Sequence, residues 1–276
     1  MIELPEARVL ARQINRTVVG KRVTGVTAGQ TPHKFAWYSG DPAMYGSRLA
    51  GKTVNGADIF SGSLRVAVGD MSLFLTTPIR FHAVGSPRPT IHQFLVEFDD
   101  SSALSCTVQM WGAMCCCPQG TEASGGVPQG HPVRDCPSPL DDAFDRPYFD
   151  RLVEAESPGN LPAKAFLAAE QRLPGLGNGV LRDILWTCGV HPKRKMGTLT
   201  DGDLGRMFQA LKSVLADMVA AGGRDTEQDL FGKSGGYRTV LSKNTVGTAC
   251  PVCGSAIQKD AYFGGAIYYC EKCQPL

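Results

Sequence analysis

The sequence predicts an α+β protein with a β-rich N-terminal part, a helical middle part and a small cysteine-containing hairpin at the C-terminus. Three observations support this fold class. Short runs of alternating apolar and polar residues recur between Val23 and Val108, which is typical of antiparallel strands. From Asp141 to Gly223 the apolar residues instead recur every three or four positions, which is typical of amphipathic helices. Two Cys-x2-Cys pairs then flank a short β-type segment.

The composition is that of a folded protein without membrane segments. The 276 residues are enough for two or three domains with separate cores. Hydrophobic residues make up 43% and charged residues 20% of the chain, as in ordinary soluble domains. The sequence has no apolar run long enough to span a membrane, and its first residues do not form a secretory signal. We therefore expect a cytoplasmic protein with reduced thiols rather than a disulfide framework.

The first element is expected to be a helix over residues 5–19. Its first turn contains a proline, which helix starts tolerate, and Glu6, whose charge suits the positive end of the helix dipole. Leu10 and Ile14 follow at helical spacing, and Gly20 ends the segment.

The region after this helix is expected to fold as a β-sandwich or barrel. Residues 64–68 and 94–98 show the alternation of a half-buried strand. Turn residues 99–102 lead from the second run into another strand over 104–108. Several short strands joined by turns predict packed sheets, and we assign a β-sandwich domain to residues 1–117.

Three further segments complete the predicted organisation. Residues 118–139 are rich in Gly, Pro, Ser and Asp and are expected to form a linker or long loop. Residues 140–223 are expected to form a helical domain, because their apolar residues follow the helical period. Residues 224–276 begin with a polar, glycine-rich stretch and end in the cysteine-containing hairpin.

The four cysteines near the C-terminus predict a structural zinc site. Cys250 and Cys253 form one Cys-x2-Cys pair, Cys270 and Cys273 form the other, and sixteen residues separate the pairs. Four thiolates complete a tetrahedral Zn²⁺ site with no open position, which is the structural and not the catalytic arrangement. Residues 262–269 between the pairs are expected to form a β-hairpin with a Gly-Gly turn. The sequence therefore predicts one Zn²⁺ ion in a hairpin finger that needs the metal to fold.

A glycine-rich junction in the helical region is a candidate phosphate-binding element. Residues 173–178 read Leu-Pro-Gly-Leu-Gly-Asn and connect two amphipathic helices. Gly175 and Gly177 permit unusual dihedral angles and a close approach of the backbone. Free N–H groups at the start of the next helix can bind a phosphate, and Asn178 can either cap that helix or donate its amide to the same phosphate. An ordinary turn remains the alternative.

The basic charge is concentrated at the C-terminus. The chain has a formal net charge of +2, but residues 231–276 carry five basic and two acidic side chains, so the rest of the chain has a net charge of −1. Lys233 and Arg238 are among these cations. A basic terminal module suits binding to phosphate groups, whereas a chance excess on a solvated surface is the alternative.

Taken together, these motifs resemble the formamidopyrimidine-DNA glycosylase / endonuclease VIII family. The resemblance is carried by residues 3–6 (Glu-Leu-Pro-Glu), by residues 173–178 with 183–186 and 189–192, and by the terminal four-cysteine finger ending in Cys273-Gln274. It implies an N-terminal β-sandwich, a helix-two-turn-helix domain and a zinc finger. It also implies a monomer that binds double-stranded DNA with a damaged base or abasic site and flips the base out of the duplex, without a small-molecule cofactor or membrane partner.

The resemblance also implies catalytic residues at the N-terminus, where this sequence departs from the family. The family attacks the sugar with the amine of a proline that follows the initiator Met, but Ile2 occupies that position here. The Met1 amine can in principle form a Schiff base in its place. Glu3 matches the acid/base position, with a charge at the helix start as the alternative role.

Other family positions differ as well. The lysine of the early β-region falls near Ser63, the phosphate-binding arginine of the finger corresponds to Ala266, and the acid of the helix motif is Asp183. Arg172, just before the junction, is a candidate for contact with backbone phosphate, with an ordinary surface role as the alternative.

A loop before the cysteine-rich run is a candidate for filling the space left by a flipped base. Met110 can wedge into the base stack and Trp111 can stack on a base, although packing at the end of a strand would explain both residues as well. The run Cys115, Cys116, Cys117 follows directly. Loop cysteines are the simplest interpretation of this run, and a redox or second metal site is the alternative.

Three functions fit these features. The favoured hypothesis is a DNA glycosylase of the base-excision-repair type that hydrolyses the N-glycosidic bond with the help of Glu3, its lyase activity being doubtful without the proline. A catalytically inactive binder of damaged or distorted DNA is the second, because neutralising the DNA backbone supplies most of the affinity. An RNA-binding zinc protein is the third.

Overall fold

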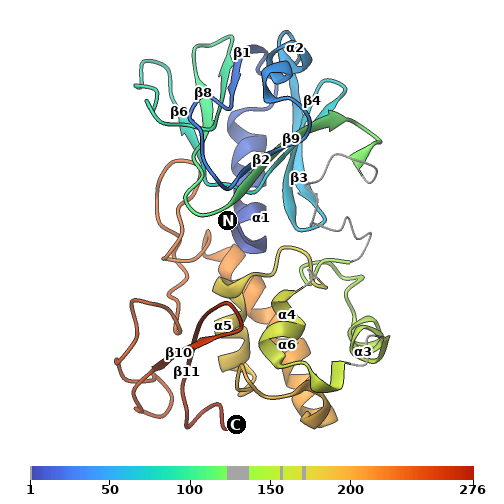
Figure 1. The fold of residues 1–276 in the computed structure, drawn as a ribbon, viewed down its shortest axis with the longest axis vertical. Helices are drawn as coiled ribbons and strands as arrows, with labels where there is room; N and C mark the ends of the chain where they lie inside the picture. Colours follow the sequence, from blue (N-terminus) through green and yellow to red (C-terminus); the bar gives the residue numbers. More distant parts are fainter. Residues whose placement is uncertain (1, 123–136, 156–157, 170–171) are drawn as a thin grey trace. The chain divides into compact units, whose positions relative to one another are not determined.

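The computed structural model describes residues 2–122, 137–155, 158–169 and 172–276 (Figure 1). The chain forms two compact units. The first consists of Met1–Asp135 and Thr226–Gly235, and the second of Cys136–Asp225 and Gly236–Leu276. A short late segment therefore belongs to the first unit. Most of the expected linker over 118–139 lies outside the described residues, and the four-part division expected from the sequence stays a prediction.

The first unit begins with a helix and continues mainly as β-strands. Its elements are α1 (Leu4–Thr17), β1 (Val23–Ala28), β2 (Ala36–Tyr38), the 3-10 turn η1 (Pro42–Met44), α2 (Tyr45–Leu49), β3 (Val54–Phe60), β4 (Ser63–Val68), β5 (Met71–Leu75), β6 (Ile79–His82), β7 (Phe94–Phe98), β8 (Ala103–Cys106) and β9 (Gly112–Pro118). The strands form two sheets, one in the order β1-β7-β8-β6 and one in the order β2-β9-β5-β4-β3.

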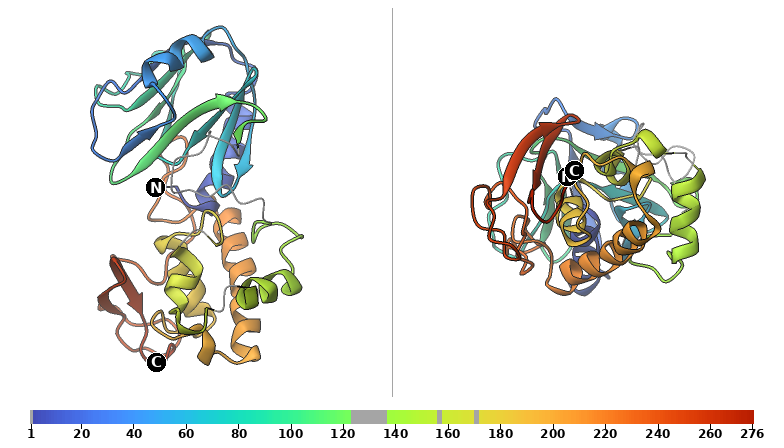
Figure 2. Two further views of the ribbon diagram at one scale, coloured as in Figure 1. Left: turned by 45° about the vertical axis from the view of Figure 1, so that its right-hand side comes forward. Right: turned by 90° about the horizontal axis from the view of Figure 1, so that it is seen from below.

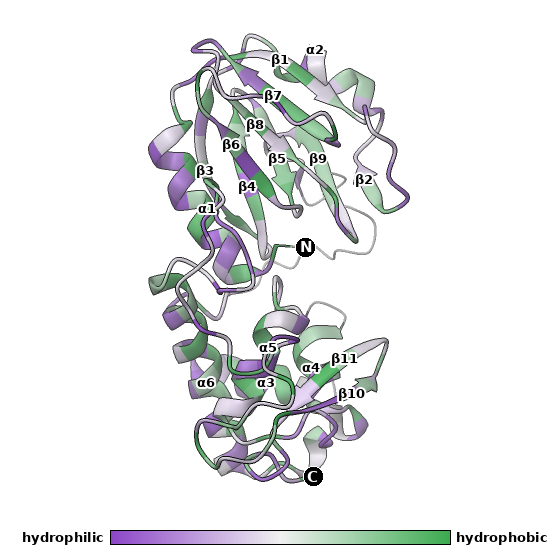
Figure 3. Ribbon diagram, turned by 90° about the vertical axis from the view of Figure 1, so that its left-hand side faces the viewer, coloured by the Kyte–Doolittle hydropathy of each residue, from purple (hydrophilic) through white to green (hydrophobic). Residues whose placement is uncertain are grey.

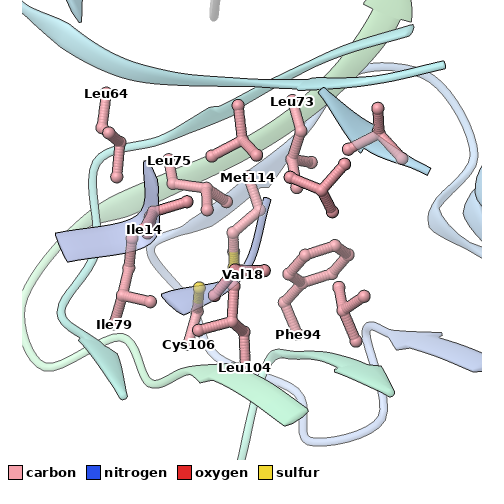
Figure 4. Packing of buried hydrophobic residues seen from close by; sticks show 14 of the residues in the cluster. Ile14, Val18, Leu64, Leu73, Leu75, Ile79, Phe94, Leu104, Cys106 and Met114 are labelled. Atoms are coloured by element: carbon pink, nitrogen blue, oxygen red, sulfur yellow. The ribbon is translucent and has the colours of Figure 1, made fainter. Parts of the chain in front are cut away.

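The core of this unit lies between its two sheets (Figure 4). Leu73 and Met114 enter it from the five-stranded sheet, while Phe94 and Leu104 enter it from the four-stranded sheet. Leu230, from the late segment, packs into the same core. Two sheets that pack face to face around one core confirm the N-terminal β-sandwich.

The leading helix packs its apolar stripe against the same core. Helix α1 ends two residues before the position expected from the sequence, and Leu10 and Ile14 are fully buried as their spacing predicts. Arg12 and Arg16 lie on the other side, and Figure 3 shows hydrophilic and hydrophobic residues on different sides of this helix. The packing fixes the position of the chain start, because the Ile2 N–H donates a hydrogen bond to the Thr76 carbonyl at 2.9 Å.

The three consecutive cysteines belong to a strand, which corrects the interpretation of loop thiols. Cys115, Cys116 and Cys117 lie in β9 and are buried. Because side chains alternate along a strand, Cys116 enters the core between the sheets, whereas Cys115 and Cys117 pack with Phe74 on the opposite face. Burial raises the pKa of all three thiols, so they act as small apolar side chains and not as nucleophiles.

The second unit is helical and ends in a hairpin. Its elements are α3 (Arg146–Ala155), the 3-10 turn η3 (Pro158–Asn160), α4 (Ala163–Ala168), α5 (Asn178–Thr187), the 3-10 turn η5 (Met196–Thr198), α6 (Asp201–Ala220), β10 (Gln258–Tyr262) and β11 (Gly265–Tyr269). Strands β10 and β11 pair in antiparallel fashion. The helical middle part and the C-terminal hairpin expected from the sequence are thus both confirmed.

Aromatic side chains from α3, α4, α6 and the preceding loop form a core for these helices. The rings of Phe144 and Phe208 stack with centroids 6.0 Å apart, and Phe149 meets Phe166 edge to face at 6.4 Å. Helix α5 packs on α6, and on its other side it contacts β11 of the hairpin (Figure 2). The hairpin is therefore placed by α5. Within the described residues, no helix has the length and apolar character needed to cross a membrane.

We expect Asp203→Asn to destabilise the second unit by about 1–2 kcal/mol near neutral pH. The Thr200 hydroxyl accepts a hydrogen bond from the Asp203 N–H, and the Asp203 carboxylate accepts one from the Thr200 N–H, which together form a capping box at the start of α6. The backbone N–H of Thr200 lowers the pKa of Asp203, so the charged carboxylate favours the folded state. Urea unfolding followed by helical circular dichroism measures the loss.

The destabilisation should depend on pH. A depressed pKa in the folded state contributes stability above the unfolded pKa of about 4, and this contribution disappears as the pH falls through the folded pKa. The difference between wild type and Asp203→Asn should therefore shrink as the pH falls from neutral through this range. Asp201→Asn is the matched control, because Asp201 is 91% exposed at the same helix start. Equal losses for the two variants would contradict the role assigned to the capping box.

Candidate metal centre and nucleic-acid interface

The four C-terminal cysteines converge on one point. Their sulfur atoms all lie within 4.8 Å of one another. The Sγ atoms of Cys253 and Cys270 are 3.3 Å apart, and those of Cys250 and Cys273 are 3.8 Å apart. Four thiolates at about 2.3 Å from a tetrahedral Zn²⁺ ion are separated by nearly the same distances. In the described part of the chain, no other group of three or more His, Cys, Asp or Glu side chains has this geometry.

Backbone hydrogen bonds shape the two turns that present these thiols. In the first turn the Gly254 N–H donates to the Cys250 carbonyl at 2.9 Å, and the positive φ of Gly254 explains why a glycine follows Cys253. In the second turn the buried side chain of Gln274 accepts from the Cys270 N–H and donates to the Val190 carbonyl. Gln274 thereby ties the second turn to the segment that follows α5.

The surroundings of Cys250 suit a metal-bound thiolate. The Nε1 atom of Trp186 in α5 is buried and meets no acceptor at ordinary hydrogen-bond geometry within the described residues. Burial raises the pKa of Cys250, but the backbone N–H groups of Cys253 and Val252 and the Trp186 indole outweigh it and leave this pKa below its usual value. A thiolate accepts N–H groups at longer distances than oxygen does, so the indole has a natural acceptor when Cys250 is charged. The cluster thus fits one structural Zn²⁺ ion.

The glycine-rich junction leaves the amide of Asn178 outside the helix cap. Gly175 has a φ of +80°, which explains the need for glycine at this turn. Gly177 is the N-cap of α5, and Asn178 is the first helical residue with an exposed side chain. The side chain of Asn178 therefore does not cap α5, and its exposed amide lies in the first turn of that helix.

Sequence reasoning missed a buried cation beside this junction. Lys164 in α4 is only 3% exposed, and its Nζ donates to the Tyr262 carbonyl at 2.6 Å and, at 3.5 Å, to that of Phe263. In the described part of the chain, no carboxylate forms an ion pair with Lys164. Burial lowers its pKa, and the positive charge of Arg182 lowers it further. The only signal in the sequence was one lysine within the apolar run Ala-Lys-Ala-Phe-Leu-Ala of α4.

The hairpin meets the junction at Gly265. A Cβ atom placed on Gly265 would lie 3.6 Å from Lys164 Nζ and 3.9 Å from Asn178 Nδ2, which is ordinary van der Waals contact. Ala266 instead packs toward the small apolar cluster of Leu241, Ile257 and Tyr268. The hairpin residue that faces the junction is therefore Gly265, one position before Ala266, and it contributes no side chain.

The remaining DNA-binding candidates lie in different environments. Arg172 is buried, with one guanidinium nitrogen 3.5 Å from the Ala169 carbonyl, so an exposed surface role does not apply. Lys233 and Arg238 are both exposed, but Lys233 belongs to the first unit and Arg238 to the second. Met110 is 81% exposed, whereas Trp111 is partly buried against Phe74 and its cysteine neighbours. Their proposed contacts with DNA stay predictions.

Ile2, the sequence neighbour of both N-terminal candidates, lines a cavity of the first unit. The cavity has a volume of about 400 Å³ and is lined by Ile2, Glu6, Arg80, Thr107, Gln109 and Gln228, among others. The late segment of this unit forms one wall, and Arg80 donates to Gln228 Oε1 at 2.6 Å. Glu3 is the N-cap of α1 and is largely buried. Met1 lies outside the described residues, so the position of its amine stays open.

The chain is similar over its whole length to formamidopyrimidine-DNA glycosylases. It is 29% identical to that of Alkalilimnicola ehrlichii over 301 residues, covering 99% of this chain and 100% of the relative. It is 27% identical to that of Mycobacterium avium over 286 residues, covering 100% of this chain and 99% of the relative. No family model matches the chain.

Solved structures share the fold. Lactococcus lactis Fpg in complex with DNA containing an abasic site superposes with a TM-score of 0.82 at 20% identity, covering 99% of this chain and 100% of that one. The MutM (Fpg) protein of Thermus thermophilus superposes with a TM-score of 0.81 at 23% identity, covering 99% and 98%. The overall fold of β-sandwich, helical part and C-terminal hairpin is thus shared along the whole chain.

We expect the purified protein to contain one zinc ion per chain, in keeping with the single four-cysteine cluster of the described residues. Cys253→Ser should lower the zinc content several-fold, because one of four thiolate ligands is lost. Cys117→Ser is the matched control, since that buried thiol lies in β9 and should leave the metal content unchanged. Zinc is measured by elemental analysis, and chelation should also change the Trp186 fluorescence. Full zinc content in Cys253→Ser would contradict the assignment.

Proposed function

We propose that the chain, which is similar over its whole length to formamidopyrimidine-DNA glycosylases, is a member of that family, binds double-stranded DNA carrying a damaged base or an abasic site, and hydrolyses the N-glycosidic bond of an oxidised base. The observation that carries the DNA-binding part is the buried Lys164 ammonium beside Asn178 at the start of α5. Among the described residues the hydrogen-bond partners of this cation are carbonyl oxygens. Burial of a cation with such partners is costly, and a phosphate group at this position would stabilise it.

The junction has the components of a phosphate site that does not read sequence. The first N–H groups of α5 carry the partial positive charge of the helix dipole. The exposed amide of Asn178 can donate one hydrogen bond, and Lys164 supplies a full charge. Lactococcus lactis Fpg has been crystallised with DNA that contains an abasic site, and a mutant of it with DNA that contains Fapy-dG. Binding to such duplexes is therefore the first activity to test for this chain.

The first unit offers a place for the chemistry. Its cavity of about 400 Å³ is large enough for a nucleobase and is lined mainly by groups that form hydrogen bonds. A base turned out of the duplex would leave a gap in the stack, and the exposed thioether of Met110, with Trp111 beside it, is suited to fill that gap. We expect the protein to work as a monomer in the cytoplasm, where the DNA of a bacterial cell lies.

Hydrolysis fits this N-terminus better than attack by an amine. The nitrogen of Ile2 is an amide that donates to Thr76, so it has no nucleophilic lone pair. In the proposed step Glu3 accepts a proton from water, the water oxygen forms a bond to C1′, and the C1′–N bond breaks with its electron pair going to the base. The proton then passes from Glu3 to the departing base. An imine between the Met1 amine and the sugar is the alternative route.

A catalytically inactive binder is the second candidate. It is favoured by the loss of a reactive nitrogen at Ile2 and by the small size of Gly265 and Ala266, neither of which offers a charged group to DNA. Such a protein would keep the junction, the finger and the charge of Lys164, which suffice for affinity to the DNA backbone.

Base release distinguishes the two candidates. The protein is incubated with duplexes carrying an oxidised purine, an oxidised pyrimidine or uracil, and the released base is measured. We expect release from at least one oxidised base, and we expect Glu3→Gln to slow it by about 10²–10⁴-fold because the proton acceptor is lost. Glu97→Gln, which changes an exposed carboxylate of β7, is the control. Retained binding without any release would support the inactive binder.

Borohydride trapping separates hydrolysis from an imine mechanism. With a duplex that contains an abasic site, we expect no covalent complex after reduction, because the Ile2 nitrogen is an amide. A trapped complex that disappears after acetylation of the N-terminus would instead assign the reaction to the Met1 amine.

Lys233→Ala and Arg238→Ala should each weaken binding and reduce the slope of log K against log salt by about 1, since each is expected to contact a phosphate. Binding is measured with a labelled duplex at several salt concentrations. Lys52→Ala is the control, because that ammonium is already paired with Asp70. Unchanged slopes for both variants would contradict contacts of these residues with the DNA backbone.

A further inference from the structure

The turn of the C-terminal hairpin presents an aromatic side chain to solvent. Only Phe263 and Gly264 connect strands β10 and β11, because Tyr262 pairs with Gly265. These two residues are the tip of the hairpin. The side chain of Phe263 is 61% exposed, and the centroid of its ring lies 5.8 Å from that of the Tyr262 ring. The hairpin therefore carries two adjacent rings at its end, and the ring of Phe263 is the more exposed of the two.

The backbone of the tip is unfavourable for phenylalanine. Phe263 has a φ of +51° and Gly264 a φ of +72°, and positive values at both central residues are those of a type I′ turn. Asn, Asp and Gly are favoured at the first of these positions, whereas bulky side chains are rare at positive φ. The ring regains little of this cost by packing, because most of it is exposed. A side chain that is costly for the fold and open to solvent is a candidate for binding.

Lys164 of α4 holds this tip in place. Its Nζ donates to the Tyr262 carbonyl at 2.6 Å and, at 3.5 Å, to the Phe263 carbonyl. The next residue of the hairpin approaches the start of α5, since a Cβ atom on Gly265 would lie 3.9 Å from Asn178 Nδ2. Because these contacts fix the backbone of the turn, the ring of Phe263 extends from a defined place. Little conformational entropy is then lost when the ring binds a partner.

The groups around the tip suit a nucleotide. The Lys164 ammonium and the Asn178 amide lie beside it and can hold a phosphate. The acidic residue of β10, Asp260, is already paired with Lys193 at 2.6 Å. An exposed ring next to groups that bind phosphate is the combination by which proteins hold unstacked nucleotides, because the ring stacks on the base while the polar groups hold the backbone.

We propose that Phe263 binds nucleic acid by stacking its ring on the face of a nucleobase that has lost its neighbour, while the junction beside it holds a phosphate of the same strand. The inference rests on the proposed function, since it names the group by which the second unit distinguishes a disturbed duplex from an intact one. In an intact duplex the stack covers both faces of each base, whereas an abasic site leaves a face uncovered. An aromatic ring replaces the missing neighbour without reading which base is present.

The experiment compares the wild type with three variants at this position on two labelled duplexes of one sequence. One duplex is intact and the other contains a tetrahydrofuran abasic-site analogue. Both are titrated at KCl concentrations from about 50 to about 300 mM, where phosphate contacts depend steeply on salt. Phe263→Ala should weaken binding to the abasic duplex about tenfold without changing the salt slope, because stacking releases no counterions. Its binding to the intact duplex should change little, and Phe263→Trp should keep wild-type binding to both.

Phe263→Asn separates binding from stability. Asn is favoured at positive φ and at the first central position of a type I′ turn, so this variant should unfold at a higher temperature than the wild type. It should nevertheless bind the abasic duplex as weakly as Phe263→Ala, because it has no ring. Val252→Ala is the matched control, since Val252 is 72% exposed but lies between Cys250 and Cys253 in the first cysteine turn. It should bind like wild type.

Zinc content and the unfolding temperature are recorded for every variant. Binding of the abasic duplex by Phe263→Ala that equals wild type would overturn the inference and leave the proposed function standing. Equal losses on both duplexes with a smaller salt slope would assign the tip to contact with the backbone and would also overturn it. Loss of zinc or a lower unfolding temperature in Phe263→Asn would make the ring a structural element, with the same consequence. Failure of the wild type to bind the abasic duplex at about 50 mM KCl, the condition of strongest backbone attraction, would refute the proposed function itself.

Discussion

One face of α5 determines where the zinc module lies, and the candidate phosphate site depends on that placement. Asn178, Arg182 and Trp186 follow one another at intervals of four residues and therefore share this face. Asn178 approaches Gly265, Arg182 stacks on Tyr268, and Trp186 reaches Cys250. The helix thus contacts the module at its turn, at its second strand and at its metal cluster.

The zinc module has little other means of holding its shape. A two-stranded hairpin is marginally stable by itself in water. The apolar cluster beside it contains only Leu241, Ile257 and Tyr268 as fully buried members among the described residues, with Trp186 of α5 packed against them. Four thiolate bonds to one ion would supply the missing stability. The Tyr262 carbonyl, which accepts a hydrogen bond from Lys164, belongs to this hairpin. Metal binding therefore also determines where this buried cation can be accommodated.

The sequence predicted those features whose cause is local. The spacing of the four cysteines predicts a metal site because each pair sits in one tight turn. The helical spacing of the apolar residues in 5–19 predicts the first helix. Gly175 was correctly predicted to adopt an unusual backbone conformation, because a turn between helices requires such dihedral angles. The β9 cysteines were misinterpreted because three adjacent thiols resemble a loop motif, whereas a strand sends them alternately to two apolar faces.

Features that depend on distant contacts escaped sequence reasoning. Lys164 was overlooked because a single lysine in an apolar helix usually extends to solvent, and only the hairpin, almost a hundred residues later, buries it. Arg182 gave no signal either, since its stacking partner Tyr268 is far away in the chain. The segment over 226–235 is polar and rich in glycine, so nothing local assigned it to the first unit, where its Leu230 fills part of the core.

Asp183 extends the role of α5 to the loop before the zinc module. Its buried carboxylate accepts hydrogen bonds from the backbone N–H groups of Val240 and Leu241 at 2.9 and 2.8 Å. Burial raises the pKa of Asp183 while these donors oppose the shift, so the carboxylate is best accommodated when the loop is in place. The backbone that follows Arg238 is thereby anchored, and Thr239 also donates to Asp225. Helix α5 therefore positions its own Arg182 and the loop that carries Arg238, and both cations depend on the same helix for their place in the second unit.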